Sequence, residues 1–301
     1  MNNLLDFIKK NSVGNYKKDV LLSFYTTYKV GGKCKLIVYP KTIDKLILLL
    51  EKLKNENILY KVIGNGSNLI FSDNNYDGVI IKLDNLNEVK INDTTVKVGA
   101  GVNLIKLSYQ MQKQGLSGLE FASGIPGTIG GAVFMNAGAY KSDMGYITSE
   151  VYVLTPNLEF KTLYNSEMKF KYRTSFLKEN PNYICLGAKL VLMHASKKEI
   201  KELMEQRRQK RLLTQPLEYP QAGSVFRNPS DTFAGKLIED CNLKGYKIGG
   251  AEVSLKHANF IINKNNASAE DIKNLITYVH DKVLKETKYD LKIEQEFVNW
   301  D

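Results

Sequence analysis

The spacing of apolar and polar residues in the first third of the chain predicts a small α/β unit. Residues 35–40 (KLIVYP) are rich in strand-forming side chains and end at Pro40, which is typical of a strand that stops there. Thr42 precedes a periodic run over residues 43–57, which predicts a helix with Thr42 as its N-cap. Apolar runs bounded by turn residues predict three more strands, at residues 60–64, 68–72 and 78–83.

A second unit with helices and strands is predicted further along. Residues 88–101 read as a hairpin with Asn92 and Asp93 at its bend, and residues 103–115 read as a helix. Gly115 is placed to end that helix as a left-handed C-cap. Strand-like runs resume at residues 150–155 and 184–193.

The last third is predicted to hold two helices of different character. Residues 197–211 are mostly charged, with glutamates among lysines and arginines, which is typical of a solvated helix face. Ser268 and Asp271 have the spacing of a capping box. They precede one apolar stripe, made of Ile272, Leu275, Ile276, Val279 and Val283. The order of elements predicts the α+β class, and 301 residues suit two or three domains.

Residues 121–140 (FASGIPGTIGGAVFMNAGAY) form the most unusual stretch, with five glycines, one proline and no charged side chain. Glycine lets backbone N–H groups approach a ligand without a Cβ in the way, which suits a large anion. A tight structural loop or a close backbone contact would explain the composition as well. On this stretch alone these interpretations stay open.

A shorter glycine motif follows the strand predicted at residues 60–64. Gly64 and Gly66 resemble part of a dinucleotide-binding fingerprint, but Leu69 stands at the third glycine position and strand-like residues follow. A strand–turn–strand can still form an anion-binding nest, with Ser67 and Asn68 as further donors. A plain hairpin turn fits equally well. Two neutral glycine segments on separate units favour a dinucleotide whose pyrophosphate lies between them.

Composition narrows the possible partners. The net charge of +10 fits nucleic acid, an anionic surface or a phosphorylated small ligand. No zinc finger, RNA-recognition signature or basic tail is found, so nucleic-acid binding is not expected. The longest apolar run, LILLL, is too short for a membrane span or signal peptide, and we expect a cytoplasmic protein. The spacing of cysteines and histidines predicts free buried thiols and no metal site: Cys34, Cys185, Cys241, His194, His257 and His280.

Six ordered blocks make the reading specific: GNGSNLIFSD, SGIPGTIGGAVFMNAGAY, YRTSFL, AGSVFRNP, LIEDCNLKGYKIGGAEVSLKHANFIIN and IEQEF. From Thr26 to Glu296 the chain resembles the UDP-N-acetylenolpyruvoylglucosamine reductases, also called UDP-N-acetylmuramate dehydrogenases. The resemblance implies an FAD enzyme of bacterial peptidoglycan synthesis that takes hydride from NADPH. It would reduce the enolpyruvyl ether on UDP-N-acetylglucosamine to the lactyl ether of UDP-N-acetylmuramate.

The resemblance also implies a fold. The family has a split FAD-binding domain of the vanillyl-alcohol-oxidase (PCMH) type and a smaller C-terminal α/β domain that closes over substrate. The short gap between Arg173 and Ser224 resembles the family's second type, which lacks an inserted loop carrying a substrate-binding tyrosine. The expected division is a leader, two FAD-binding subdomains and a substrate-binding domain, at residues 1–25, 26–86, 87–196 and 197–301.

Three catalytic residues follow from the matching blocks. Arg173 matches the arginine that binds the substrate carboxylate, a role suited to a planar guanidinium that stays charged. Ser224 matches the proton donor to the enolate carbon. Glu296 matches the second acid of the family's L-E-P-E-V block and can hold the enol form only when it is protonated. The family usually carries arginine two residues further, where this chain has Val298.

The remaining site residues also come from the resemblance. Substrate contacts are expected from Asn228 and Lys244, and less securely from His257. Since neither glycine segment contains histidine or cysteine, we expect FAD to be bound without a covalent link. The expected FAD-binding residues are Gly64, Asn65, Gly66, Ser67, Asn68, Ser123, Gly124, Ile125, Pro126, Gly127, Gly130 and Gly131.

Two alternatives remain. A related flavin oxidase on the same FAD fold would have no use for the AGSVFRNP block and would consume oxygen rapidly. A basic nucleic-acid-binding protein with glycine loops would purify colourless and bind duplex DNA with a steep salt dependence.

Overall fold

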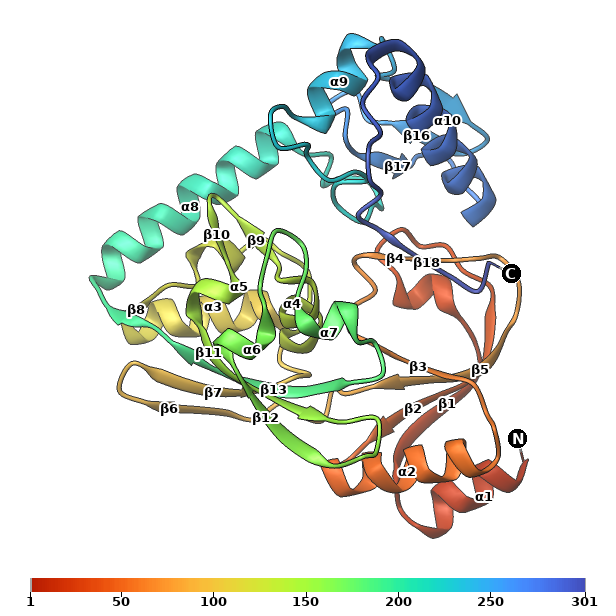
Figure 1. Cartoon of the computed structure of the whole chain (residues 1–301), viewed down its shortest axis with the longest axis vertical. Coiled ribbons are helices and arrows are strands. Elements are labelled where there is room, and N and C mark those ends of the chain that lie inside the picture. Colours follow the sequence, from red (N-terminus) through yellow and green to blue (C-terminus); the bar gives the residue numbers. More distant parts are fainter. Residues whose placement is uncertain (1, 301) are drawn as a thin grey trace. The chain divides into compact units, whose positions relative to one another are not determined.

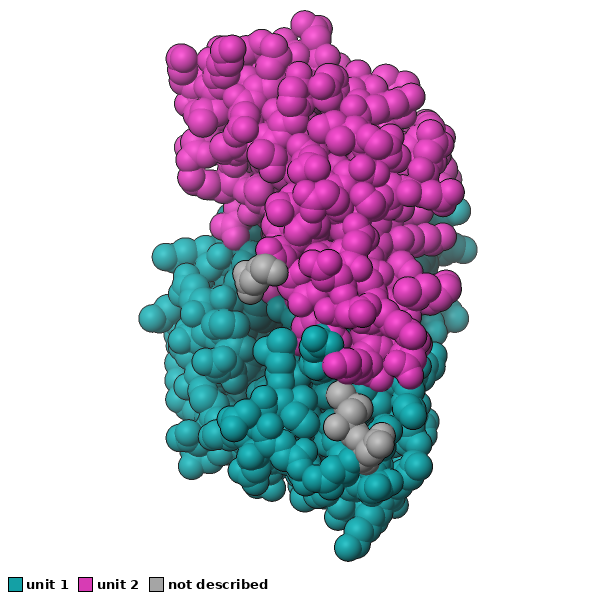
Figure 2. Space-filling model, turned by 90° about the vertical axis from the view of Figure 1, so that its right-hand side faces the viewer, with its two compact units in different colours: residues 1–18, 36–64, 77–208 teal, residues 19–35, 65–76, 209–301 magenta. Residues whose placement is uncertain are grey.

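The computed structural model describes residues 2–300 and confirms a mixed α+β architecture (Figure 1). Contacts divide the chain into two compact units, coloured separately in Figure 2. The first unit comprises residues 1–18, 36–64 and 77–208, and the second comprises residues 19–35, 65–76 and 209–301. The domain ranges expected from the sequence stay a prediction. The units are cut differently, because two short N-terminal segments group with the C-terminal residues.

The first sheet has the strand order β1–β2–β5–β3, with β3 and β5 parallel. The expected strands and the helix α2 (Ile43–Asn55) are confirmed, and the Thr42 hydroxyl accepts from Lys45 N at 3.3 Å as the N-cap. The sheet contains β1 (Gly14–Leu21), β2 (Lys33–Pro40), β3 (Tyr60–Ile63) and β5 (Tyr76–Lys82).

The segment expected to be a leader is structured. It contains the helix α1 (Asn2–Lys10) and then β1, which ends the sheet beside β2. Leu4 and Ile8 of α1 are buried in the core of the first unit. Polar residues occupy most of β1, which therefore lacks the alternation that would have revealed a strand.

The second sheet is antiparallel, with the order β12–β11–β13–β7–β6. The predicted hairpin is confirmed, with Asp93 at positive φ in its turn, and Gly115 ends α3 (Leu104–Gln114) in the left-handed conformation. The sheet contains β6 (Val89–Asn92), β7 (Thr95–Gly99), β11 (Thr148–Leu154), β12 (Phe160–Tyr164) and β13 (Ile184–Val191). The helix α4 (Ile129–Met135) packs against β7 and β13 (Figure 1).

Short elements complete the first unit around this sheet. They are β8 (Leu116–Ser117), η2 (Glu120–Ala122), β9 (Gly138–Ala139), β10 (Ser142–Asp143), α5 (Met144–Ile147), α6 (Asn165–Met168), α7 (Phe176–Glu179) and β14 (Met193–His194). The charged helix α8 (Lys197–Thr214) is confirmed, and its residues beyond 208 belong to the second unit.

The second unit is built on an antiparallel sheet, β15–β16–β17, against which α10 packs. The capping box of Ser268 and Asp271 is confirmed, and the whole predicted apolar stripe of α10 is buried. A separate parallel pair joins β4 to β18, from opposite ends of the chain. The elements are η1 (Leu22–Tyr25), β4 (Leu69–Phe71), α9 (Ala234–Asp240), β15 (Lys247–Ile248), β16 (Ala251–Val253), β17 (Ile261–Asn263), α10 (Ala269–Thr287) and β18 (Glu296–Val298).

The three cysteines are free and buried, as predicted. Within residues 2–300, none of the helices combines the length and apolar character that crossing a membrane requires.

Candidate active site

Gly64, the first residue of the shorter glycine segment, meets the longer segment at residues 121–140 inside the first unit. A Cβ built on Gly64, which follows β3, would lie 2.6 Å from the hydroxyl oxygen of Thr128 in the second segment. Lys82 of β5 is buried, and its Nζ donates to Gly64 O at 2.7 Å. The chain therefore brings Gly64 against the second glycine segment, with a lysine fixing the carbonyl behind it.

The second glycine segment contains the short helix α4, which the sequence analysis missed. Thr128 caps this helix by accepting from Gly131 N, while the N–H groups of Ile129 and Gly130 donate to neighbouring backbone carbonyls at 2.9 Å. These two amides are thus used by the fold. Gly127 differs, because a Cβ added there would meet nothing within 4 Å. The open space beside Gly127 fits the approach of a ligand to bare backbone.

In the second unit, the turn at residues 65–68 is shaped by its own packing. Gly66 has a φ of +63°, and a Cβ there would lie 2.1 Å from Tyr25 O, so the fold itself requires glycine. Asn68 joins this turn to the C-terminal segment: its side-chain nitrogen donates to Glu294 O at 3.1 Å, and its carbonyl accepts from Glu296 N at 2.9 Å. The part that Asn65 and Ser67 play toward a cofactor stays a prediction.

Arg173 occupies a tight turn of the first unit. Lys171 and Thr174 exchange two backbone hydrogen bonds of 3.0 Å, with Arg173 between them at a φ of +54°. Positive φ is uncommon for a side chain of this size and is often found at functional positions. The guanidinium donates to Gly138 O at 2.9 Å and lies 5.0 Å from the centre of the Tyr172 ring. Arg173 is therefore held at a fixed place beside the end of the second glycine segment.

Ser224 lies in a segment of the second unit that is neither helix nor strand, and side chains hold it. The amide group of Asn259 accepts from Phe226 N and donates to Phe226 O, at 2.9 and 2.8 Å. The Gln295 amide nitrogen lies 3.2, 3.4 and 3.4 Å from the carbonyl oxygens of Ala222, Gly223 and Ser224. The side chains of Asn259 and Gln295 are buried, and Ser224 itself is half-buried.

Glu296 begins β18, directly after Gln295. Its strand pairs with β4, and Glu294 N donates to Val225 O at 2.8 Å. The C-terminal segment is thus bonded on one side to the turn of Asn68 and on the other to Val225, the residue that follows Ser224. Ser224 and Glu296 therefore lie on neighbouring segments of one unit.

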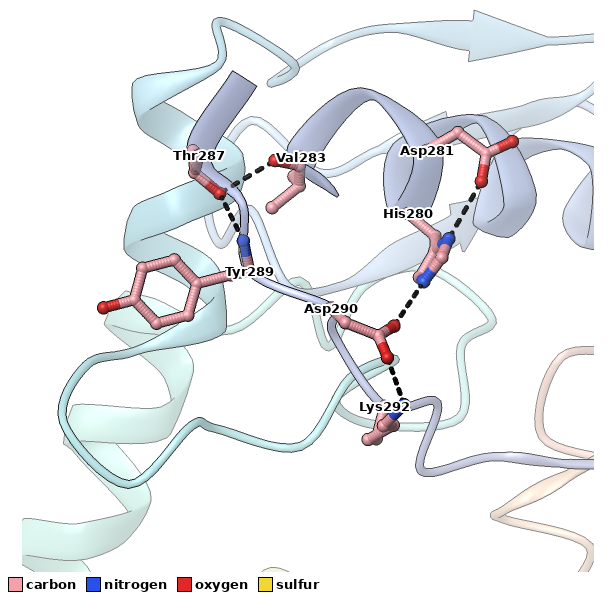
Figure 3. A network of polar contacts seen from close by, with 7 residues as sticks. All are labelled: His280, Asp281, Val283, Thr287, Tyr289, Asp290 and Lys292. Carbon is pink, nitrogen blue, oxygen red and sulfur yellow. Dashed lines mark hydrogen bonds and ion pairs between the residues drawn. The ribbon is translucent and has the colours of Figure 1, made fainter. Parts of the chain in front are cut away.

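The approach to this segment is fixed by an ion network (Figure 3). The two ring nitrogens of His280 lie 2.9 Å from Asp281 and 2.9 Å from Asp290, and Asp290 also pairs with Lys292. The carboxylates hold the pKa of His280 above its usual value, the Asp290 bond being the stronger cause. This network ties the end of α10 to the residues that lead to Glu296.

The three expected substrate residues surround α9. Asn228 accepts from Ala234 N at 3.1 Å, so it caps that helix in this structure. Lys244 pairs with Glu239 at 3.0 Å. His257 accepts from Asn259 N through Nδ1, and burial, with a smaller contribution from nearby Lys244, holds its pKa below the usual value. A neutral His257 keeps an N–H at Nε2 for a ligand.

The sequence analysis missed three polar residues that organise the site. Asn259 and Gln295 pin the segment of Ser224, and Lys82 binds Gly64. Lys82 carried a readable signal, since it is a charged residue within the otherwise apolar run GVIIKL. Asn259 and Gln295 carried none, because their partners lie 33 and more than 70 positions away.

Comparison with known proteins agrees with this architecture. Residues 34–159 match the family described as FAD binding domain, and residues 215–298 match the one described as UDP-N-acetylenolpyruvoylglucosamine reductase, C-terminal domain. A glucose dehydrogenase, Phl p 4.0202, shares the fold at a TM-score of 0.51 and 14% identity, over 65% of this chain and 44% of that one. The protein is therefore an FAD-dependent oxidoreductase with a PCMH-type FAD-binding domain and a distinct C-terminal domain.

Closer relatives define the family. The UDP-N-acetylenolpyruvoylglucosamine reductase of Anoxybacillus flavithermus is 46% identical over 292 residues, 97% of this chain and 95% of that protein. The Bacillus subtilis protein of the same name is 39% identical over 99% of each chain. A crystal structure of the Thermus caldophilus reductase superposes with a TM-score of 0.80 at 34% identity, over 94% of this chain and 98% of that one. The chain belongs to the UDP-N-acetylenolpyruvoylglucosamine reductase family, as the sequence blocks predicted.

Proposed function

We propose that this enzyme uses NADPH to reduce the enolpyruvyl ether of UDP-N-acetylglucosamine-enolpyruvate to UDP-N-acetylmuramate, a precursor of peptidoglycan. The observation that carries the proposal is the placement of Ser224 and Glu296 on neighbouring, hydrogen-bonded segments of one unit, in a chain of this family. This reduction needs one group that donates a proton to the substrate carbon and a carboxyl group that hydrogen-bonds to the enol form of the substrate carboxylate. The reaction would take place in the cytoplasm, where NADPH and nucleotide sugars are made.

The residues around the glycine segments fit a bound FAD. The open space beside Gly127 admits a ligand to the backbone, and Lys82, which also pairs with Asp84 at 3.4 Å, fixes the carbonyl of Gly64. We assign the pyrophosphate of FAD to Gly64 and the second glycine segment, within the first unit. When bound, FAD would accept two electrons from NADPH and pass them to the enolpyruvyl group.

The protein side chains would manage the charge that develops on the substrate. Reduction at the methylene carbon drives electrons toward the substrate carboxylate, so a fixed cation stabilises the transition state. Arg173, held by Gly138 O in a strained turn, is assigned this role. Ser224 would then protonate the adjacent carbon, and a protonated Glu296 would donate a hydrogen bond to the enol form of the carboxylate.

The nucleotide half of the substrate would be bound near α9. Lys244 supplies a flexible charge for a diphosphate, and its present partner Glu239 is exposed and can be exchanged. Asn228 and His257 would add hydrogen bonds from either side. The net charge of +10 favours the capture of three polyanions: FAD, NADPH and the UDP-sugar.

The experiment is a stopped-flow comparison of wild type and Ser224→Ala at the flavin absorbance band, under anaerobic conditions. NADPH should bleach both proteins at similar speed, because that step needs no proton from Ser224. Recovery of the yellow colour on adding the enolpyruvyl substrate should be about 10² to 10⁴ times slower in the variant, the usual worth of a positioned acid. The lost hydroxyl should cost about 1 kcal/mol of folding stability, so FAD stays bound.

Four results would contradict the proposal. A protein that purifies colourless, or that retains flavin in the pellet after acid precipitation, excludes non-covalent FAD. Equal slowing of both half-reactions would make Ser224 a residue that supports the flavin. Unchanged recovery would mean that the proton comes from another group.

A further inference from the structure

We propose that Gln295 is a positioning residue for Ser224: its side-chain amide holds the segment 222–224 so that the Ser224 hydroxyl is presented to the substrate. This inference rests on the proposed function, in which Ser224 is the proton donor. Gln295 lies immediately before Glu296, so one residue links the two candidate acids.

The first support is the geometry of the Gln295 amide nitrogen. It lies within 3.2 to 3.4 Å of three successive carbonyl oxygens, those of Ala222, Gly223 and Ser224. An amide has two N–H groups, so three acceptors share them, which explains distances at the long end of the range. A side chain aimed at three consecutive carbonyls fixes the course of that segment and not only one atom of it.

The second support is the other end of the same amide. The Gln295 oxygen accepts from the hydroxyl of Tyr28 at 3.2 Å, and Tyr28 O in turn accepts from Asn263 at 3.0 Å. Gln295 is 5% exposed and Tyr28 is fully buried. The three carbonyl oxygens can only accept, so the amide nitrogen faces them and the amide oxygen faces the Tyr28 hydroxyl, which donates to it.

The third support is the lack of regular structure around Ser224. The segment 222–224 lies in neither a helix nor a strand, and Gly223 has a φ of +76°. On the C-terminal side of this segment, backbone hydrogen bonds begin at Val225, whose N–H donates to Asn259 O at 2.9 Å and whose carbonyl accepts from Glu294 N at 2.8 Å. Ser224 therefore depends on Gln295 for its position more than a serine within a strand would.

The position of an acid matters more for proton transfer than for binding. A displacement of about 1 Å at a reacting group can cost on the order of 10²-fold in rate. Loss of the Gln295 amide should therefore slow the half-reaction that uses Ser224 and leave the reduction of flavin by NADPH unchanged. A residue needed only for folding would affect flavin content and both half-reactions alike.

The test compares Gln295→Met, Tyr28→Phe, Ser224→Ala and the double variant Gln295→Met/Ser224→Ala by anaerobic stopped flow. Methionine keeps the length of the side chain and removes every hydrogen bond. We expect Gln295→Met to recover its yellow colour with the enolpyruvyl substrate about 10 to 100 times more slowly than wild type, with NADPH bleaching within twofold. Tyr28→Phe removes the hydrogen bond at the other end of the Gln295 amide and should slow the same half-reaction by a smaller factor than Gln295→Met. Thr287→Val is the control: it removes a hydroxyl that donates to Val283 O at 2.8 Å on α10, and both half-reactions should stay within about threefold of wild type.

The double variant decides whether Gln295 acts through Ser224. If it does, the double variant is no slower than Ser224→Ala alone, because there is no hydroxyl left to position. Multiplying effects, equal slowing of both half-reactions, or a Gln295→Met protein as fast as wild type would each overturn the inference. If Ser224→Ala itself recovers at wild-type speed, the proposed role of Ser224 fails, and the inference about Gln295 fails with it.

Gln295→Glu keeps the proposal testable if Gln295→Met does not fold or loses FAD. A protonated glutamic acid can still donate to the segment and accept from Tyr28, whereas a carboxylate would face three carbonyl oxygens. The rate of the substrate half-reaction of Gln295→Glu should therefore fall as the pH rises, while the rate of its NADPH half-reaction follows the pH profile of wild type. Identical pH profiles of the variant and wild type in the substrate half-reaction would overturn the inference.

Discussion

The two compact units differ in the interactions that join the chain segments within each of them. The first is built on a large aliphatic core, to which α2 contributes Leu46, Leu49, Leu50 and Leu53. The second also has an apolar core, and polar side chains further join its three separate chain segments. Tyr28 binds Gln295, Asp73 caps α10, and the Trp300 indole donates to Ile70 O at 2.8 Å. Apolar periodicity therefore specifies most of the first unit, whereas in the second unit long-range hydrogen bonds act beside an apolar core and position the candidate acids.

The largest expected effect is the loss of core packing in the first unit. Leu49 is fully buried, so Leu49→Ala should lower the free energy of unfolding by about 2 to 5 kcal/mol, through lost apolar burial and the cavity left behind. Urea unfolding followed by circular dichroism measures this change. Leu59→Ala is the control, because Leu59 is 63% exposed and should change stability by less than about 0.5 kcal/mol. Equal losses in the two variants would contradict the assignment of the core.

The next largest effect is on the rate of the substrate half-reaction. Arg173→Lys keeps the charge and loses the planar fork, so the substrate half-reaction should slow by about 10² to 10³. Lysine also cannot reproduce both the bond to Gly138 O and the contact with a carboxylate at the same time. The measurement is recovery of flavin absorbance with substrate at saturating concentration. Arg208→Lys, on the exposed face of α8, serves as the control, and a fully active Arg173→Lys would show that another group binds the carboxylate.

The fold of the first unit could be predicted from the sequence wherever the apolar pattern was strong. α2, α3 and the hairpin of β6 and β7 lie where their periodicity and turn residues place them. α1 and β1 were missed, since α1 is short and β1 is largely polar. The helix α4 was hidden by the glycines that begin it.

The candidate site could be predicted only in part, and only through the resemblance of whole blocks. Spacing alone could not relate Ser224 to Glu296, because 72 positions separate them and their link is a network of single hydrogen bonds. Gly66 was expected to bind FAD, but the close approach of Tyr25 O already requires glycine there, whether or not a ligand binds. The pattern of apolar and polar residues shows which face of a segment is buried, whereas a single buried amide such as that of Gln295 produces no pattern.

A smaller effect tests whether polar contacts hold the second unit. The Asp73 carboxylate accepts from Ala269 N at 2.8 Å and Glu270 N at 3.3 Å, which adds an N-cap to α10 from a segment about 200 positions away. Asp73→Ala should cost about 1 kcal/mol of unfolding free energy, measured in urea. Asp73→Asn keeps an acceptor oxygen and should lose less. Asn74→Ala removes a neighbouring exposed side chain and should be neutral; a loss as large as that of Asp73→Ala would contradict the capping role.

The smallest effect is a dependence of stability on pH, from the network in Figure 3. Only a doubly protonated ring can donate to both Asp281 and Asp290, so folding favours the charged form of His280 and raises its pKa, chiefly through Asp290. This contribution is fully present below the unfolded pKa of about 6.5 and is lost as the pH rises through the higher folded pKa. His280→Gln should therefore be less stable than wild type at pH 6 and nearly equal to it at pH 9, as measured by the midpoint of thermal unfolding. His194→Gln is the control, because its ring is 67% exposed beside a single carboxylate and salt screens such a pair. If the difference in unfolding midpoint between wild type and His280→Gln stayed constant from pH 6 to pH 9, the charge of His280 would not contribute to stability. The histidine would then act by packing alone.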